Sequence, residues 1–128
     1  MAFHEPTQEQ LATIVARPAE PFVMVNLLRY KRDADGQVVG HTSYLAYSEA
    51  VLPMVAAVGG APVWGGKADS VFIGDDRDDW DAVVLVQYPS PSAFVEMVSS
   101  EEYGAIHQLR LDGLETTAIV ACTPGMIA

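Results

Sequence analysis

Three residues near the C-terminus combine side chains suited to chemistry with a spacing that places them together. In the segment SSEEYGAIHQLR (99–110), Tyr103, His107 and Arg110 follow one another at intervals of four and three residues. Residues at these intervals share one face of a helix. A histidine can shuttle protons near neutral pH, an arginine can bind a carboxylate or stabilise an enolate or phenolate, and a tyrosine can donate a hydrogen bond or stack on a ring. The stripe predicts His107 as acid/base, Arg110 as anion partner and Tyr103 as a substrate contact.

Plain packing is the alternative for the same stripe. Ile106 shares this face, so Tyr103 and Ile106 would pack on a sheet while Arg110 pairs with a nearby carboxylate and His107 lies at the rim. An enzyme requires His107 and Arg110 to converge on one cavity. A non-catalytic binding module requires only an apolar cavity, and a purely structural dimer requires none.

Four more residues are candidates for substrate binding. Asn26 interrupts the apolar run FVMVNLLRY, and a buried amide without partners costs about 1–3 kcal/mol. It therefore either pins a bulge or loop through backbone hydrogen bonds or points into a ligand cavity. Tyr44 and Tyr47 share a helix face with valines and either pack in the core or line a pocket. Trp64, beside Gly65-Gly66, either forms the floor of a cleft or packs in an ordinary way.

The segments around these residues predict helices and strands in a definite order. Helices are expected at 7–17, 42–58, 90–99 and 99–110, with capping boxes at Thr7/Gln10 and Ser99/Glu102. Strands are expected at 22–30, at 81–88 and from Leu114, with two short pieces, APVWGG and DSVFIG, between the first two. Apart from the N-terminal helix, this is the split βαβ, ferredoxin-like order of an α+β protein, with an antiparallel sheet and helices on one face.

The strands are apolar on both sides, although helices can cover only one face of such a sheet. Large exposed apolar patches are rare on monomers, so a second copy of the chain is expected to cover the other face. The predicted organisation is an N-terminal helical extension over 1–19 and one ferredoxin-like domain over 20–128, dimerising through its sheet.

Composition restricts the partners and the location. The 128 residues suit one domain, and 17 acidic against 7 basic side chains give a formal net charge of −10. An acidic surface repels phosphate groups, so neither nucleic acid nor a membrane is expected as a partner. No apolar run reaches the roughly 18 residues of a membrane span, and MAFHEPTQEQ lacks the pattern of a signal peptide. A cytoplasmic location is therefore expected. The single cysteine, Cys122, cannot form an intrachain disulfide, and its apolar surroundings predict a buried thiol.

Neither a metal nor a cofactor is expected. The three histidines, His4, His41 and His107, lack the helical spacing of a zinc site and have no cysteine pair. The acidic run DDRDDWD lacks the glycine and glutamate of an EF-hand, which favours a solvated turn. The glycine pairs 59–60 and 65–66 do not form a phosphate-binding loop.

Five segments together resemble a known superfamily. VNLLRYK, GHTSYLAYSEAVLP, VGGAPVWGG, WDAVVLVQYPS and SSEEYGAIHQLR are similar to the dimeric α+β barrel superfamily, and most similar to its branch called domain of unknown function 1330, over roughly residues 20–124. The superfamily includes cofactor-free monooxygenases of aromatic polyketides, muconolactone-type isomerases and haem enzymes. The resemblance implies two facing sheets enclosing a barrel, with clefts inside it or under the helices. The positions that match its tyrosines, arginine and polar strand residue are Asn26, Tyr44, Tyr47, Tyr103 and Arg110, and no position clearly matches the haem-binding histidine.

These observations lead to one functional expectation and its alternatives. The chain is expected to be a dimeric enzyme that acts without a cofactor on a small aromatic or carboxylated metabolite, by oxygenation or proton-transfer isomerisation. The alternatives are a non-catalytic small-molecule-binding module and a purely structural dimer.

Overall fold

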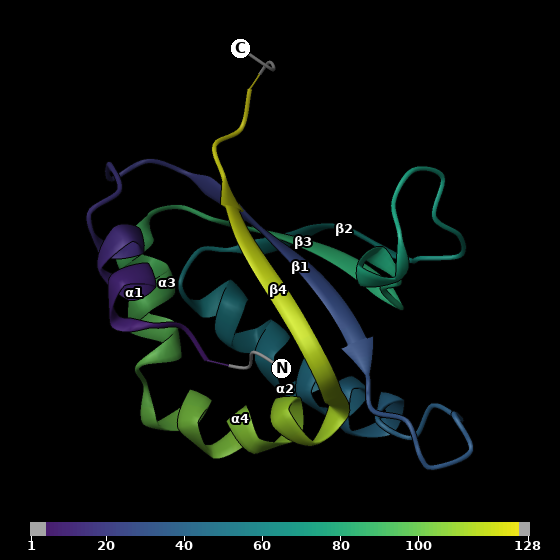
Figure 1. Cartoon of the computed structure of the whole chain (residues 1–128). Coiled ribbons are helices and arrows are strands. Elements are labelled where there is room, and N and C mark those ends of the chain that lie inside the picture. The colour runs from purple at the N-terminus through teal and green to yellow at the C-terminus, as the bar shows by residue number, and fades with distance from the viewer. Residues whose placement is uncertain (1–4, 126–128) are drawn as a thin grey trace.

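A computed structural model of the chain, which describes residues 5–125, contains one antiparallel sheet with α-helices packed against one face (Figure 1). The elements are α1 (Gln8–Val15), β1 (Phe22–Tyr30), α2 (His41–Ala57), β2 (Ala61–Lys67), the 3₁₀ helix η1 (Asp76–Asp78), β3 (Ala82–Tyr88), α3 (Pro91–Val98), α4 (Glu101–Gly113) and β4 (Leu114–Cys122). The strand order β2-β3-β1-β4 is that of the split βαβ arrangement. The predicted α+β, ferredoxin-like fold class is confirmed.

The helix starts show one correct and one wrong capping prediction. The capping box between Thr7 and Gln10 is present at the start of α1. The box predicted between Ser99 and Glu102 is wrong, because Ser99 is the C-cap of α3 and has helical dihedral angles. An N-cap residue needs an extended backbone. Ser100 has one, and its hydroxyl accepts a hydrogen bond from the backbone N–H three residues later.

The segment between β2 and β3 does not form the strand piece predicted for DSVFIG. Residues 68–75 form a loop that projects from the sheet on the side away from α2 (Figure 1). At its tip, Phe72 is 97% and Ile73 is 87% exposed. The apolar and β-branched residues of this segment suggested a strand, but strand preference depends on a surface for the side chains to pack on. The loop has none within the described part of the chain.

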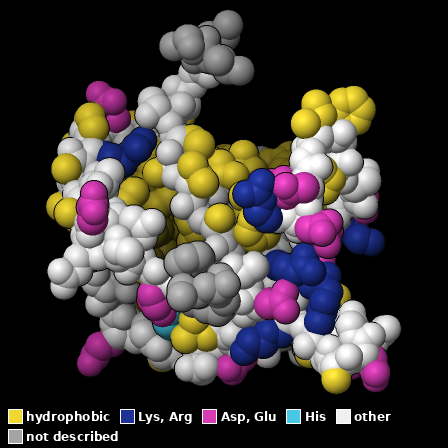
Figure 2. All heavy atoms as spheres, in the orientation of Figure 1, with side chains coloured by type: hydrophobic (Ala, Val, Ile, Leu, Met, Phe, Trp, Pro, Cys, Tyr) yellow, Lys and Arg dark blue, Asp and Glu magenta, His cyan; other side chains and the backbone are white. Residues whose placement is uncertain are grey.

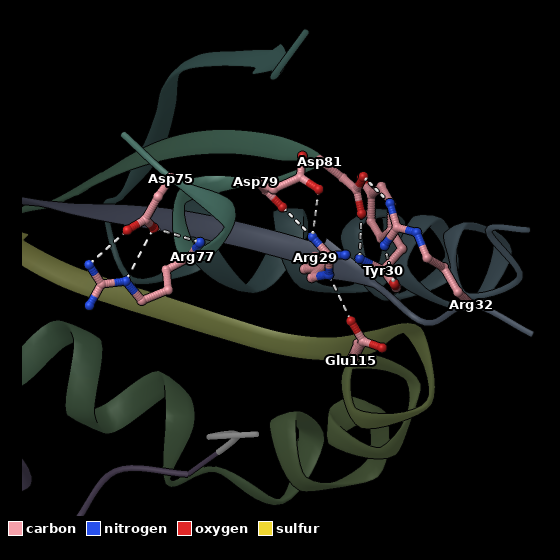
Figure 3. A network of polar contacts seen from close by, with 8 residues as sticks. All are labelled: Arg29, Tyr30, Arg32, Asp75, Arg77, Asp79, Asp81 and Glu115. Atoms are coloured by element: carbon pink, nitrogen blue, oxygen red, sulfur yellow. Dashed lines mark hydrogen bonds and ion pairs between the residues drawn. The ribbon is translucent and has the colours of Figure 1, made fainter. Parts of the chain in front are cut away.

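Hydrogen-bonded ion pairs hold the base of this loop against β1 (Figure 3). The Asp81 carboxylate accepts hydrogen bonds from the Arg32 guanidinium at 2.7 Å and from the Tyr30 N–H at 2.8 Å. Burial alone would raise the pKa of Asp81, but these hydrogen bonds outweigh burial and lower it. Arg29 pairs with Asp79 at 3.1 Å. The acidic run is thus tied to two arginines of the first strand and its following loop.

The hydrophobic core lies between the sheet and the helices. Its buried residues come from three strands and three helices: Phe22, Met24, Leu28, Tyr44, Tyr47, Val55, Tyr88, Met97, Tyr103 and Leu114. Four of these ten side chains are tyrosines. Their hydroxyls need partners when buried, so the core combines apolar packing with polar groups at defined positions.

The opposite face of the sheet is apolar and has no helix over it. The strand register places Val25 of β1 between Leu85 of β3 and Val120 of β4 on this face. Trp64 of β2 pairs with Leu85 on the same side, and Trp64 and Val120 are 58% and 50% exposed. Figure 2 shows hydrophobic side chains gathered on both sides of β4 across the middle of the molecule. Cys122 is exposed rather than buried, because it ends the edge strand β4.

Candidate functional site

A small cavity of about 50 Å³ lies between the sheet and the helix layer. Its lining residues are Met24, Asn26, Tyr47, Tyr88, Phe94, Met97, Val98, Tyr103, Arg110 and Ile119. Four of the seven predicted site residues, Asn26, Tyr47, Tyr103 and Arg110, therefore meet at one cavity although they come from β1, α2 and α4. The other three, Tyr44, Trp64 and His107, do not line it.

Two glycines bring α2 and α4 close enough to build this wall. A Cβ atom on Gly40, at the start of α2, would lie 2.0 Å from the carbonyl oxygen of Gly113, at the end of α4. That oxygen also accepts a hydrogen bond from the Lys31 N–H at 2.9 Å. No larger residue fits at Gly40 without a backbone shift. The contact anchors one end of the helix pair, and further along it Tyr47 of α2 faces Tyr103 of α4.

The Tyr47 and Tyr103 side chains form a hydrogen-bonded pair at the cavity wall. Their hydroxyl oxygens are 2.9 Å apart, and their rings meet edge to face with centroids 6.1 Å apart. Burial, together with the neighbouring Tyr103 hydroxyl, raises the pKa of Tyr47 well above its ordinary value. Tyr47 therefore stays neutral and remains able to donate a hydrogen bond. Tyr44 packs behind it, with ring centroids 5.4 Å apart, and burial raises the pKa of Tyr44 to about 12.

Arg110 is a buried charge without an acidic partner. It is 4% exposed, and its Nη2 donates a hydrogen bond to the Thr117 hydroxyl at 3.2 Å. Thr117 in turn donates to the carbonyl oxygen of Leu27 at 2.8 Å. Among residues 5–125, no carboxylate lies within ion-pair distance of this guanidinium. The alternative in which Arg110 pairs with a nearby carboxylate is therefore wrong. A guanidinium has five N–H donors, and the one hydrogen bond that Arg110 makes to a described residue is that to Thr117.

Asn26 fits both interpretations that the sequence left open, because it binds backbone carbonyls and also lines the cavity. Its Nδ2 donates to the carbonyl oxygens of Met24 and Val84, each at 3.2 Å. The same side chain lines the cavity. Both backbone partners can only accept hydrogen bonds, which fixes the amide orientation with the nitrogen toward the strands. The side-chain oxygen, Oδ1, accepts no hydrogen bond from the residues that the structure describes.

His107 lies beside the tyrosine–arginine wall but faces another neighbour. Its Nε2 is 2.6 Å from the carboxylate of Glu5, and its buried Nδ1 has no hydrogen-bond partner in the described part of the chain. The centroids of the His107 and Tyr103 rings are 5.6 Å apart. At about 100° per helical residue, Tyr103 and Arg110 lie about 20° apart around α4, whereas His107 lies about 60° from Arg110. His107 and Arg110 therefore lie on the same broad face of α4, but only Arg110 lines the cavity.

Two site features could not be assigned from residue type alone. Thr117 accepts a hydrogen bond from Arg110. In the sequence, Thr117 is marked only as a polar residue two positions before Ile119, on the same inward side of β4. The apolar lining from α3 reads in the sequence as ordinary core. Trp64, predicted as a cleft floor, instead lies on the sheet face away from the cavity, and its ring covers the backbone of Gly66.

The family model that matches this chain covers residues 34–123, which is well over half of it, and describes a domain of unknown function, DUF1330. The chain belongs to the DUF1330 family. The predicted resemblance is thereby confirmed. No curated protein matches the chain. Within the described residues, no helix is long and apolar enough to span a bilayer.

Solved structures place this DUF1330 protein among ferredoxin-like folds. A protein of unknown function from Rhodopseudomonas palustris is 29% identical, with a TM-score of 0.87 over 99% of this chain and 100% of that chain. A hydroxynitrile lyase from Passiflora edulis is 11% identical, with a TM-score of 0.64 over 87% of this chain and 100% of that chain. A dimeric protein of unknown function with a ferredoxin-like fold from Bacteroides fragilis is 12% identical, with a TM-score of 0.55 over 79% of this chain and 93% of that chain. The last two similarities concern the fold alone.

Proposed function

We propose that this DUF1330 protein binds a small carboxylate in the cavity, with Arg110 as the partner of the anion. The observation that carries the proposal is a guanidinium, 4% exposed and without an acidic partner among residues 5–125, at the wall of a cavity. An unpaired buried charge is costly, and a bound carboxylate would neutralise it through charge-assisted hydrogen bonds.

The remaining wall supports a small organic anion rather than a hydrated ion. Most lining side chains are apolar or aromatic, and the polar groups come from Asn26, Arg110, the Tyr47–Tyr103 pair and the Tyr88 hydroxyl. A few polar groups converging on an otherwise apolar cavity is the usual design of a small-molecule site. A cavity of about 50 Å³ admits only a small ligand of a few non-hydrogen atoms.

Thermal unfolding in the presence of matched ligands tests this proposal. Acetate should raise the unfolding midpoint of the wild type, whereas acetamide, which has the same shape and no charge, should not. Arg110→Met should abolish the effect of acetate. Arg29→Met removes an arginine that already pairs with Asp79 and Glu115 and should keep it. An equal response of both variants to acetate would refute Arg110 as the anion site.

A second candidate function, proton-transfer catalysis of the isomerase type, is supported by the tyrosine pair. A tyrosine hydroxyl beside a guanidinium can give its proton to the α-carbon of an enolate that the guanidinium stabilises, and the tyrosinate left behind takes a proton back from water. Tyr103 or Tyr47 would serve here, because His107 does not line the cavity. Conversion of an enol acid to its keto form in D₂O, followed by NMR, would reveal this activity as deuterium at the α-carbon, and Tyr103→Phe should slow it at least tenfold.

The uncovered apolar face of the sheet supports a homodimer. Val25, Leu85 and Val120 lie side by side on it, and such a patch calls for a partner surface. Because a net charge of −10 makes two copies repel each other, the contact would have to be stabilised by apolar burial rather than by ion pairs. The ferredoxin-like protein from Bacteroides fragilis is itself described as dimeric.

A further inference from the structure

We propose that the ligand of this cavity is a small hydroxy acid, a carboxylate with a hydroxyl group on the adjacent carbon. This inference rests on the proposed carboxylate site and names its substrate class. It follows from counting which donors and acceptors the cavity wall leaves for a ligand.

The wall contains one polar atom that can only accept a hydrogen bond and that no described residue uses, Asn26 Oδ1. Asn26 donates from Nδ2 to two strand carbonyls, at 3.2 Å each. Its Oδ1 accepts no hydrogen bond from any described residue, and the side chain lines the cavity. When a ligand fills the cavity and excludes water from it, this amide oxygen needs a donor from the ligand. Acetate or another simple carboxylate has none, so it would leave Oδ1 unsatisfied.

Arg110 can only donate hydrogen bonds, whereas the hydroxyls of Tyr47, Tyr88 and Tyr103 can both donate and accept. Arg110 uses one N–H for Thr117 and keeps the rest. The Tyr47 and Tyr103 hydroxyls share one hydrogen bond, so one hydroxyl gives its hydrogen to the other and the second keeps its own. A guanidinium that only donates and an amide oxygen that only accepts match a ligand that carries a carboxylate and, as its own donor, a hydroxyl.

A neutral hydroxyl suits this cavity better than an ammonium group as the ligand's hydrogen-bond donor, because Arg110 already brings a positive charge. An amino acid would bring its positive charge into the cavity that Arg110 occupies. No carboxylate lines this cavity to offset that second charge, and like charges in a buried site repel strongly. A neutral hydroxyl satisfies Asn26 Oδ1 without this penalty. Glycolate, with five non-hydrogen atoms, also suits a space of about 50 Å³.

NMR titration of the ¹⁵N-labelled protein with glycolate, acetate and glycine tests the inference. One net hydrogen bond predicts that glycolate binds roughly three- to tenfold more tightly than acetate. Glycine should bind more weakly than glycolate. In Asn26→Leu the preference for glycolate over acetate should disappear while both still bind, because Arg110 is intact.

The outcomes separate this inference from the proposal beneath it. If neither acid binds the wild type, the carboxylate site itself is wrong. If both acids bind the wild type equally, or glycine binds as well as glycolate, only the hydroxy-acid inference is overturned. The wild-type ratios decide this even if Asn26→Leu does not fold. A preference that survives in a folded Asn26→Leu protein would refute Asn26 as the hydroxyl's partner.

Discussion

The hydroxyl oxygens of Tyr47 and Tyr103 lie 2.9 Å apart and join α2 to α4 at the cavity wall. These helices are 56 residues apart at this point in the sequence, and they also meet at the contact between Gly40 and Gly113. The tyrosine pair therefore links the two helices. It also places two hydroxyl groups, which can transfer protons, at the cavity wall.

The tyrosine link should appear as an energetic coupling. Tyr47→Phe and Tyr103→Phe should each lower the free energy of unfolding by about 1 kcal/mol, because each leaves one buried hydroxyl without its partner. The double variant should lose less than the sum, with a coupling of about 0.5–1.5 kcal/mol. Urea unfolding of the four proteins measures this cycle. Strictly additive losses would mean that the hydroxyls do not interact.

Alkaline pH should destabilise the protein through its buried tyrosines. Burial raises the pKa of Tyr44 from an ordinary value of 10.0 to about 12, and it also raises those of Tyr47 and Tyr88. The unfolded chain therefore ionises first, so this stability is fully present below about pH 10 and is lost as pH rises toward about 12. Urea midpoints across this range test the prediction. Tyr44→Phe should make the decline shallower, and a midpoint that stays constant above pH 10 would contradict the tyrosines' burial.

The glycine contact that positions the two helices should tolerate no side chain. Gly40→Ala places a methyl group 2.0 Å from the Gly113 carbonyl oxygen, which forces a backbone shift and should cost at least about 2 kcal/mol. Gly104 is the matched control, because a methyl group there meets nothing within 4 Å in the exposed part of α4. Gly104→Ala should stabilise the protein by about 0.5–1 kcal/mol. Equal effects of the two changes on thermal unfolding would exclude the close contact.

The uncovered apolar face of the sheet predicts a homodimer. A single charged residue introduced on that face should disrupt it. Val120→Asp places a carboxylate on this face of β4 and should convert the wild-type dimer to a monomer in sedimentation velocity at micromolar concentration. Val39 is a similarly exposed valine, at 55%, in the loop before α2, and Val39→Asp should leave the dimer intact. A wild type that sediments as a monomer would overturn the homodimer, and loss of the dimer in both variants would indicate a general charge effect.

The fold was predictable because its signals are local and repeat along each element. Apolar runs with β-branched residues at 22–30 and 81–88, and a serine–proline start at Ser90-Pro91, correspond to β1, β3 and α3. The failures have physical reasons. DSVFIG has the composition of a strand but no surface to pack on, and Ser99 has the residue type of an N-cap but the helical backbone of the C-cap of α3.

The site was predictable only in part, because it depends on where side chains from different elements point. The spacing of Tyr103 and Arg110 correctly indicated one face of α4, and Asn26 and Tyr47 were recognisable as polar groups in apolar surroundings. The spacing could not show that His107 faces Glu5, because that contact spans 102 residues. Nor could it show that Arg110 would lack an acidic partner, which depends on the whole packing around it.

The guanidinium of Arg110 offers the most direct test of the carboxylate site. Its side-chain Nε–Hε signal can be observed by ¹⁵N NMR and assigned by its absence in Arg110→Met. Titration with acetate should shift this signal saturably, while acetamide leaves it in place and the surface arginines respond to neither. An Arg110 signal that stays unmoved at saturating acetate would contradict the account.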